Sequence, residues 1–198
     1  MHFYFISHPN VQISADVPVP QWPLSELGRR RMRTGLQQPW VAGLSAVHSS
    51  CERKALDSAE ILAGHLGLPV HTHEALGEND RSTTGFLPPA EFERVADEFF
   101  ARPAQSVRGW ETAAAAQARI VGAVQHLAVR ERLRNPGGGG SIAILSHGAV
   151  GTLLYCHLAG LPISRRWDQP GNGGGNYFRF ELNPPRVQGS WQPIDGEG

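Results

Sequence analysis

Short apolar runs alternate with longer helical patterns along most of this chain. The runs at residues 2–7, 44–48, 68–72, 141–146 and 177–182 are rich in aliphatic and aromatic side chains and are bounded by turn residues. Such runs are typical of buried strands. Because strands that alternate with helices form βαβ units with right-handed crossovers, the pattern predicts a mostly parallel sheet with helices on both faces.

The helices are predicted from capping residues and from the spacing of apolar positions. Ser25 and Ser50 precede two such segments and are expected to be their N-caps, and Gly67 is expected to end the second. Within that second segment, apolar residues recur at intervals of three and four, which indicates one buried stripe. We expect helices from Ser25 to about Leu36, from Ser50 to Gly67, around residues 92–99, over Glu111–Arg134 and over Ala149–Leu158.

The length of 198 residues suits a single domain with a sizeable core. We expect residues 1–198 to form one domain, with its core in residues 1–182 and an irregular tail over residues 183–198. The glycine-rich stretches at residues 135–140 and 171–175 are expected to be loops. The second of these neither follows an identifiable strand nor opens a helix, so it is not predicted to be a dinucleotide-binding loop.

Composition excludes several classes of protein. The 18 basic and 18 acidic residues balance, which gives no electrostatic case for a nucleic-acid partner. No apolar run approaches the ~20 residues that a membrane span needs, and no signal peptide is recognisable. Cys51 and Cys156 are too few for a disulfide scaffold, so we expect a reducing, cytoplasmic location. Nothing in the sequence indicates an oligomeric state.

Two histidines stand where chemistry is expected in such a fold. His8 and His147 each follow a serine at the end of a predicted strand, and each precedes a turn-permissive residue. In open α/β sheets, ligands bind outside the carboxyl ends of the strands. We therefore expect the two imidazoles to face one shared site.

A candidate anion site lies between another strand end and the helix that follows it. The segment Ser49–Ala55 combines the exposed N–H groups of a helix start with the charges of Arg53 and Lys54. Lys54 is the only lysine in the chain, whereas the other 17 basic residues are arginines. With His8 and His147, this segment predicts a pocket suited to a phosphoryl group.

Together, these segments resemble the histidine phosphatase superfamily, also called phosphoglycerate-mutase-like. The family's Arg-His-Gly triplet is matched by Ser7-His8-Pro9, and its Ser-His-Gly triplet by residues 146–148. Its Pro-Leu-Thr-Glu-Leu-Gly segment is matched by residues 23–28, and its Leu-x-Glu loop by residues 76–78. Its Ser-Ser-x-x-x-Arg-Ala-x-x-Thr-Ala segment is matched by residues 49–59, with Lys54 at the arginine position. The order and spacing agree over roughly residues 1–182.

The resemblance implies a three-layer α/β/α sandwich and a phosphatase that hydrolyses a small phosphomonoester without a cofactor. His8 would attack phosphorus and become a phosphohistidine. Glu78 would protonate the leaving oxygen and later activate water, although Glu74 and Asp80 lie close to it in the sequence. His147 and nearby cations would stabilise the equatorial oxygens.

Departures from the family pattern weaken the expected phosphate site. Ser7 replaces an arginine, Pro9 replaces a glycine and cannot donate an N–H, and Lys54 replaces a second arginine. We expect weaker phosphate binding than in the family generally, with Arg53 or Arg81 as compensating cations. The candidate phosphate-binding residues are therefore Ser7, Lys54, Arg53 and Arg81.

Three alternative functions stay open at this point. The chain could be a catalytically silent domain that binds a phosphorylated ligand, or a phosphoglycerate-mutase-type phosphotransferase. A metal hydrolase could use His8 and His147 with His71 or His73. No third ligand is spaced as in a known zinc motif, so no metal is expected.

Overall fold

A six-stranded mixed sheet forms the centre of the protein in the computed structural model, which describes residues 1–137 and 139–196. The strand order is β3-β2-β4-β1-β5-β6. The first four strands in that order are parallel, and β5 and β6 add an antiparallel hairpin to the β1 edge. The strands are β1 (Phe3–Ser7), β2 (Leu44–Ser49), β3 (Val70–Thr72), β4 (Ser141–Ser146), β5 (Asn176–Leu182) and β6 (Pro185–Pro193).

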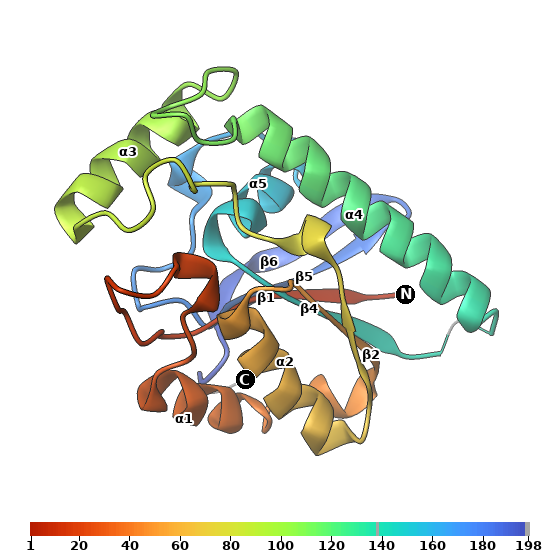
Figure 1. The fold of residues 1–198 in the computed structure, drawn as a ribbon. Helices are drawn as coiled ribbons and strands as arrows, with labels where there is room; N and C mark the ends of the chain where they lie inside the picture. Colours follow the sequence, from red (N-terminus) through yellow and green to blue (C-terminus); the bar gives the residue numbers. More distant parts are fainter. Residues whose placement is uncertain (138, 197–198) are drawn as a thin grey trace.

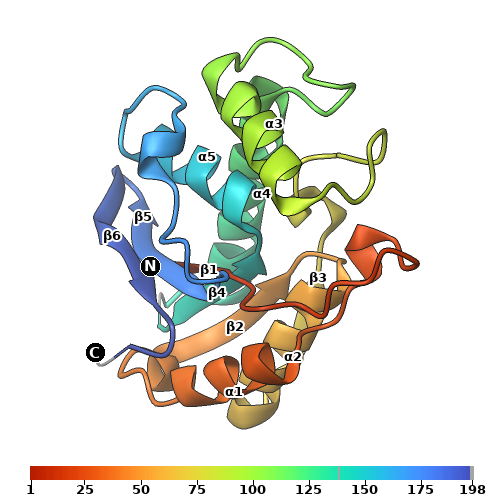
Figure 2. The same cartoon turned by 90° about the vertical axis from the view of Figure 1, so that its left-hand side faces the viewer.

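Helices cover both faces of this sheet, as Figures 1 and 2 show. Helices α1 (Glu26–Gly35) and α2 (Arg53–Leu66) lie on one face. Helices α3 (Pro89–Ala101), α4 (Ala113–Arg134) and α5 (Gly148–Leu158) lie on the other. The predicted three-layer α/β/α architecture is thereby confirmed.

Strand β1 shows why its first four residues are all aromatic or aliphatic. Phe3 and Phe5 belong to the core cluster beneath α4 and α5, whereas Tyr4 and Ile6 belong to the cluster beneath α1 and α2. Successive side chains of a strand point to opposite faces, so a strand covered on both sides buries all of them.

The helix starts are partly as expected. The Ser25 side chain accepts a hydrogen bond from the Gly28 N–H at 3.1 Å, which confirms it as the N-cap of α1. The predicted N-cap at Ser50 is wrong, because α2 begins at Arg53 with Glu52 as its N-cap residue. Ser50 Oγ instead accepts from the Glu52 N–H and contacts His147, so it belongs to the turn before the helix. Gly67 ends α2 in the left-handed conformation, as expected.

The predicted irregular tail is wrong for most of its length. Residues 185–193 form β6, which pairs with β5 along its length. This strand lies at the sheet edge and buries only Trp191 among its described residues, so it shows little apolar alternation. An edge strand also tolerates the prolines that argue against a strand elsewhere. Residues 197–198 of the predicted tail lie outside the described part of the chain, as does residue 138 of the loop before β4.

The topology brings the carboxyl ends of β1, β2 and β4 to one edge of the sheet. Two loop segments with short 3₁₀ helices reach the same edge: η1 (Val19–Gln21), between β1 and α1, and η3 (Glu74–Leu76), after β3. The remaining 3₁₀ helices are η2 (Val41–Gly43) and η4 (Arg165–Trp167). Among the described helices, none combines the length and apolarity required to cross a membrane.

Candidate active site

His8 and His147 meet at the carboxyl ends of neighbouring strands. Ser7 and Ser146 are paired in the parallel register of β1 and β4, so the next residue of each strand enters the same space. The two imidazole centroids lie 5.2 Å apart, and the rings are inclined by 70°. The expected meeting of two distant histidines is therefore present in the fold.

The His8 ring is held in one orientation by the backbone. Its Nδ1 lies 3.0 Å from the Pro9 carbonyl oxygen, and this contact requires a proton on Nδ1. A neutral ring with that tautomer keeps an unshared electron pair on Nε2. Burial, reinforced by the positive charge of Lys54, lowers the pKa of His8 to about 4. At neutral pH, His8 therefore has the protonation state of a nucleophile.

His147 is fully buried, and its Nε2 contacts two groups. Its Nε2 lies 2.9 Å from Ser50 Oγ and 3.3 Å from Glu52 Oε1. Burial lowers the pKa of His147 well below its usual range, although the Glu52 carboxylate opposes that shift. Its Nδ1 is buried and has no hydrogen-bond partner among the described residues. One polar ring atom is therefore available to a bound group.

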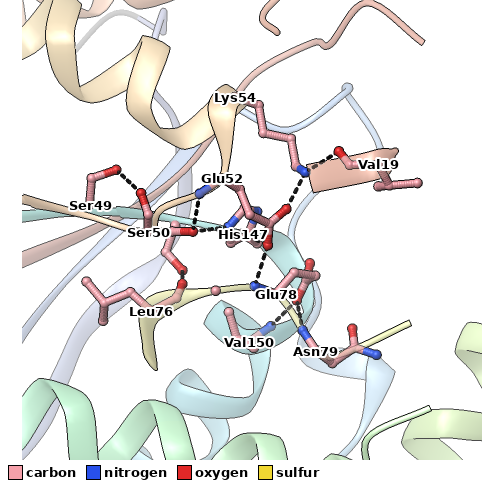
Figure 3. A network of polar contacts seen from close by, with 12 residues as sticks. Val19, Ser49, Ser50, Glu52, Lys54, Leu76, Glu78, Asn79, His147 and Val150 are labelled. Carbon is pink, nitrogen blue, oxygen red and sulfur yellow. Dashed lines mark hydrogen bonds and ion pairs between the residues drawn. The ribbon is translucent and has the colours of Figure 1, made fainter. Parts of the chain in front are cut away.

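Glu78 is fixed by backbone N–H groups. Its carboxylate accepts hydrogen bonds from Ala149 and Val150 in the first turn of α5, at 3.2 and 3.1 Å, and from Asn79 at 3.1 Å (Figure 3). Burial raises the pKa of Glu78, and the negative charge of Glu52 adds to the rise. A carboxyl group with a raised pKa can act as a proton donor.

Glu52 is a site residue that sequence reasoning missed. Its Oε1 accepts from the Glu78 N–H at 2.9 Å, while its Oε2 forms an ion pair with Lys54 (Figure 3). Burial by itself would raise the pKa of Glu52, but His147 and Lys54 lower it to about 2. Position 52 falls on an unspecified position of the resembled motif, so the only available signal was a carboxylate two residues before the single lysine.

Two of the candidate phosphate-binding cations, Lys54 and Arg81, already have partners within the protein. The Lys54 ammonium is buried between Glu52 and the Val19 carbonyl oxygen, to which it donates at 2.9 Å. Arg81 lies over the rings of Phe92 and Trp110, at 5.0 and 5.7 Å, and lines the adjacent cavity.

Two of the four candidate phosphate ligands are not brought to the histidine pair. Arg53 turns outward, where it pairs with Asp57 at 2.6 Å, and half of its side chain is exposed. Ser7 Oγ donates to Gln169 Oε1 at 2.5 Å and accepts from the Asn176 N–H at 3.1 Å. Ser7 therefore ties β1 to the start of β5.

A cavity of about 640 Å³ adjoins these residues. Glu52 and Glu78 belong both to its wall and to the group around His147. The rest of the wall comes from the loop at residues 15–20 and the segment at residues 79–86. A small molecule in this cavity would therefore lie against the site that carries the histidines.

His71 and His73 are not placed with the histidine pair. His73 Nε2 lies 2.9 Å from His48 Nδ1, and the His71 ring packs 5.3 Å from that of His48. The part of the chain that the structure describes contains no group of three His, Cys, Asp or Glu residues arranged to hold a metal ion. The geometry thus gives no support to the metal hydrolase that uses His8, His147 and one of these residues.

Comparison with solved structures finds the same fold in several proteins, phosphatases among them. A mycobacterial glucosyl-3-phosphoglycerate phosphatase in complex with inorganic phosphate is similar over 99% of both chains, with a TM-score of 0.80 and 18% identity. Bacillus stearothermophilus YhfR is similar over 94% of both chains, with a TM-score of 0.73 and 23% identity. Phosphoserine phosphatase from Entamoeba histolytica, in complex with 3-phosphoglyceric acid, is similar over 96% of this chain and 96% of its own, with a TM-score of 0.69 and 17% identity.

These identities are low enough that the structural likeness shows the fold alone, and no curated protein matches the chain. The sequence itself is more informative. The family model of the histidine phosphatase superfamily (branch 1) matches residues 5–189, which span nearly all of the sheet and every described helix. The chain therefore belongs to the histidine phosphatase superfamily, and that membership supports a phosphatase in general terms.

Proposed function

We propose that this protein hydrolyses a small phosphomonoester through a phosphohistidine on His8. The observation that carries the proposal is the placement of the His8 ring, whose Nδ1 lies 3.0 Å from the Pro9 carbonyl oxygen. Because burial lowers its pKa to about 4, the ring is neutral near pH 7, and this contact places its proton on Nδ1. The free Nε2 is then a competent nucleophile, and the buried Glu78 carboxyl group of raised pKa belongs to the same group of residues through Glu52 and His147.

In the first step, the Nε2 electron pair of His8 forms a bond to phosphorus while the bond from phosphorus to the leaving oxygen breaks. The Glu78 carboxyl group gives its proton to that oxygen, so an alcohol leaves. In the second step, a water molecule attacks phosphorus and gives a proton to the Glu78 carboxylate. The N–P bond breaks, inorganic phosphate leaves, and His8 is restored as a neutral ring.

The charge that develops on the phosphoryl oxygens is stabilised by His147 and by the two nearby cations. In the tautomer in which the Ser50 hydroxyl donates to Nε2, the unpartnered Nδ1 of His147 carries the ring proton and can donate it to a phosphoryl oxygen. Arg81 contributes a guanidinium from the cavity wall. Because Lys54 is already paired with Glu52, phosphate binding is expected to be weak for a phosphatase.

The test is to trap the intermediate. The protein is mixed with a ³²P-labelled aryl phosphate, quenched within milliseconds and assayed for label that is stable to base but labile to acid. We expect such label in the unaltered protein and in the control His126→Ala, whose histidine is exposed on α4. No label should appear in His8→Ala. Label that persists in His8→Ala, or turnover without any label in the unaltered protein, would refute the assignment of His8.

A catalytically silent phospho-ligand-binding domain is the second candidate function. The specific observation in its favour is that the Glu52 carboxylate already neutralises Lys54 at the place where a substrate anion is expected. Saturable binding of inorganic phosphate without turnover of any aryl phosphate would favour this function. A phosphoglycerate-mutase-type phosphotransferase would instead pass the labelled phosphoryl group to a second alcohol in preference to water.

A further inference from the structure

The cavity beside the histidine pair has an acidic wall. Apart from the general acid, the carboxylates of Asp16, Glu52 and Asp80 line it. Arg81 is the only basic residue among the described residues of that wall. The pKa of Glu52 is lowered to about 2, and hydrogen bonds from Ser82 lower the pKa of Asp80. The wall therefore keeps a negative charge over the whole physiological pH range.

A second observation indicates that the cavity is built to hold a ligand. Asn79 lies in the wall with only 4% of its surface exposed, and its Nδ2 has no hydrogen-bond partner among the described residues. A buried amide N–H₂ group without a partner is energetically unfavourable. An oxygen atom of a ligand in the cavity, from a phosphoryl or hydroxyl group, would satisfy it.

The outer part of the wall is apolar and stiff. Val17, Pro18, Val19 and Pro20 form one side, and Phe86 contributes a partly exposed ring to the other. That ring packs edge-on against Trp22, with 5.7 Å between the ring centroids. Such a wall offers few partners to a polyhydroxylated leaving group, whereas it suits methylene and methyl groups. An aromatic face near carboxylates also attracts an organic cation.

The balance of charge decides which leaving group fits. A bound phosphomonoester brings close to two negative charges, while the Lys54 ammonium is already paired with Glu52. A leaving group with its own carboxylate would add repulsion from the acidic wall, and a cationic one would relieve it. We propose that the natural substrate is a phosphomonoester whose leaving group carries a positive charge, namely the phosphate ester of an amino alcohol or of a quaternary ammonium alcohol. This inference rests on the proposed phosphatase function and names the substrate class of that site.

The test compares two substrates of the same shape. Phosphocholine and 3,3-dimethylbutyl phosphate differ only in a nitrogen cation against a neutral carbon, and p-nitrophenyl phosphate serves as the reference for turnover. Since partly exposed charge pairs contribute up to about 1 kcal/mol each, we expect kcat/KM to favour phosphocholine by about fivefold or more. The preference should shrink in Asp16→Asn and in Asp80→Asn. It should persist in Glu60→Gln, which removes a charge from an exposed residue of α2 outside the cavity wall.

Failure of this inference is separable from failure of the proposed function. Equal or better turnover of the neutral isostere, with normal turnover of p-nitrophenyl phosphate, would overturn the substrate class and leave the phosphatase intact. If no phosphomonoester is turned over, the same pair is compared by calorimetric titration. Tighter binding of phosphocholine that depends on Asp16 and Asp80 would then support the cationic ligand class, and equal binding would overturn it.

Discussion

The Lys54 ammonium is paired with the Glu52 carboxylate of its own helix start, and both side chains are largely removed from solvent. Figure 3 shows this pair beside His147, with the ammonium also directed at the Val19 carbonyl. The Glu52 carboxylate is therefore the partner of Lys54, the residue that the family resemblance predicts to bind phosphate. A phosphate that binds Lys54 would have to compete with that carboxylate or share the lysine with it.

Glu52→Gln should therefore bind inorganic phosphate more tightly. The substitution removes a negative charge from the site and frees Lys54, so we expect the inhibition constant of phosphate to fall about tenfold, which corresponds to about 1.4 kcal/mol. Competitive inhibition of aryl phosphate turnover measures this constant, and Glu60→Gln is the control for a charge lost elsewhere on α2. An unchanged or higher inhibition constant would show that Glu52 does not oppose phosphate.

The same variant should be less stable without ligand. An ammonium that is 3% exposed would lose its ionic partner, and breaking a buried ion pair costs about 3–5 kcal/mol. Without phosphate, the midpoint of thermal unfolding should be lower in Glu52→Gln than in the unaltered protein. Added phosphate should raise the midpoint of the variant by more than it raises that of the unaltered protein. A midpoint that phosphate does not restore would indicate that the anion does not reach Lys54.

The activity should be greatest under mildly acidic conditions. His8 stays neutral down to a pKa of about 4, so protonation of the nucleophile should reduce kcat/KM only near that pH. Glu78 must carry its proton in the first step, and its pKa is raised above the ordinary 4.5, so activity should decline as the pH rises through that raised value. A profile of kcat/KM against pH with an alkyl phosphate, whose leaving group needs the proton, and the loss of its alkaline limb in Glu78→Gln, would check both assignments.

Stability should also depend on pH in a direction set by the histidines. Burial lowers the pKa of His8 to about 4 and that of His48 to about 3, whereas both bind protons near pH 6.5 in the unfolded chain. The unfolded state therefore binds more protons below pH 6.5, and the free energy of unfolding should fall as the pH drops from 6.5 toward 4. Urea unfolding at several pH values measures this slope, which His48→Gln should reduce.

Much of the fold follows from residues whose environment is local or strongly periodic. The apolar runs of β1 and β4 and the histidines that follow them could be predicted, because a strand buried on both faces is apolar at most of its positions. Strand β6 could not, because an edge strand that buries little beyond Trp191 has no such pattern.

The contacts of the charged residues in the site could not be predicted from the sequence. Arg53 and Lys54 are adjacent in the sequence, yet one points to solvent and Asp57 while the other is buried against Glu52. Which of two neighbouring cations turns inward depends on how α2 is rotated against the sheet, and a motif of residue types does not specify that rotation. For the same reason the role of Glu52 emerges only from its contacts with Glu78 and His147.

Glu78→Gln should affect substrates according to their leaving groups. The one carbonyl oxygen of glutamine can keep the hydrogen bonds that Oε1 accepts from Asn79 and Val150, but the bond from Ala149 to Oε2 is lost and the amide cannot supply a proton. Since general acid catalysis contributes about 10²–10⁴-fold, kcat/KM for an alkyl phosphate should fall by at least about a hundredfold. An aryl phosphate with a nitrophenolate leaving group needs little protonation, so its formation of the phosphoenzyme should fall far less. The measurement is the rate of phosphohistidine formation in a single turnover with each substrate. Equal losses for both substrates would mean that Glu78 acts by positioning the site rather than by donating a proton. The same two substrates would then be compared in Asp80→Asn, where a larger loss for the alkyl phosphate would identify Asp80 as the proton donor.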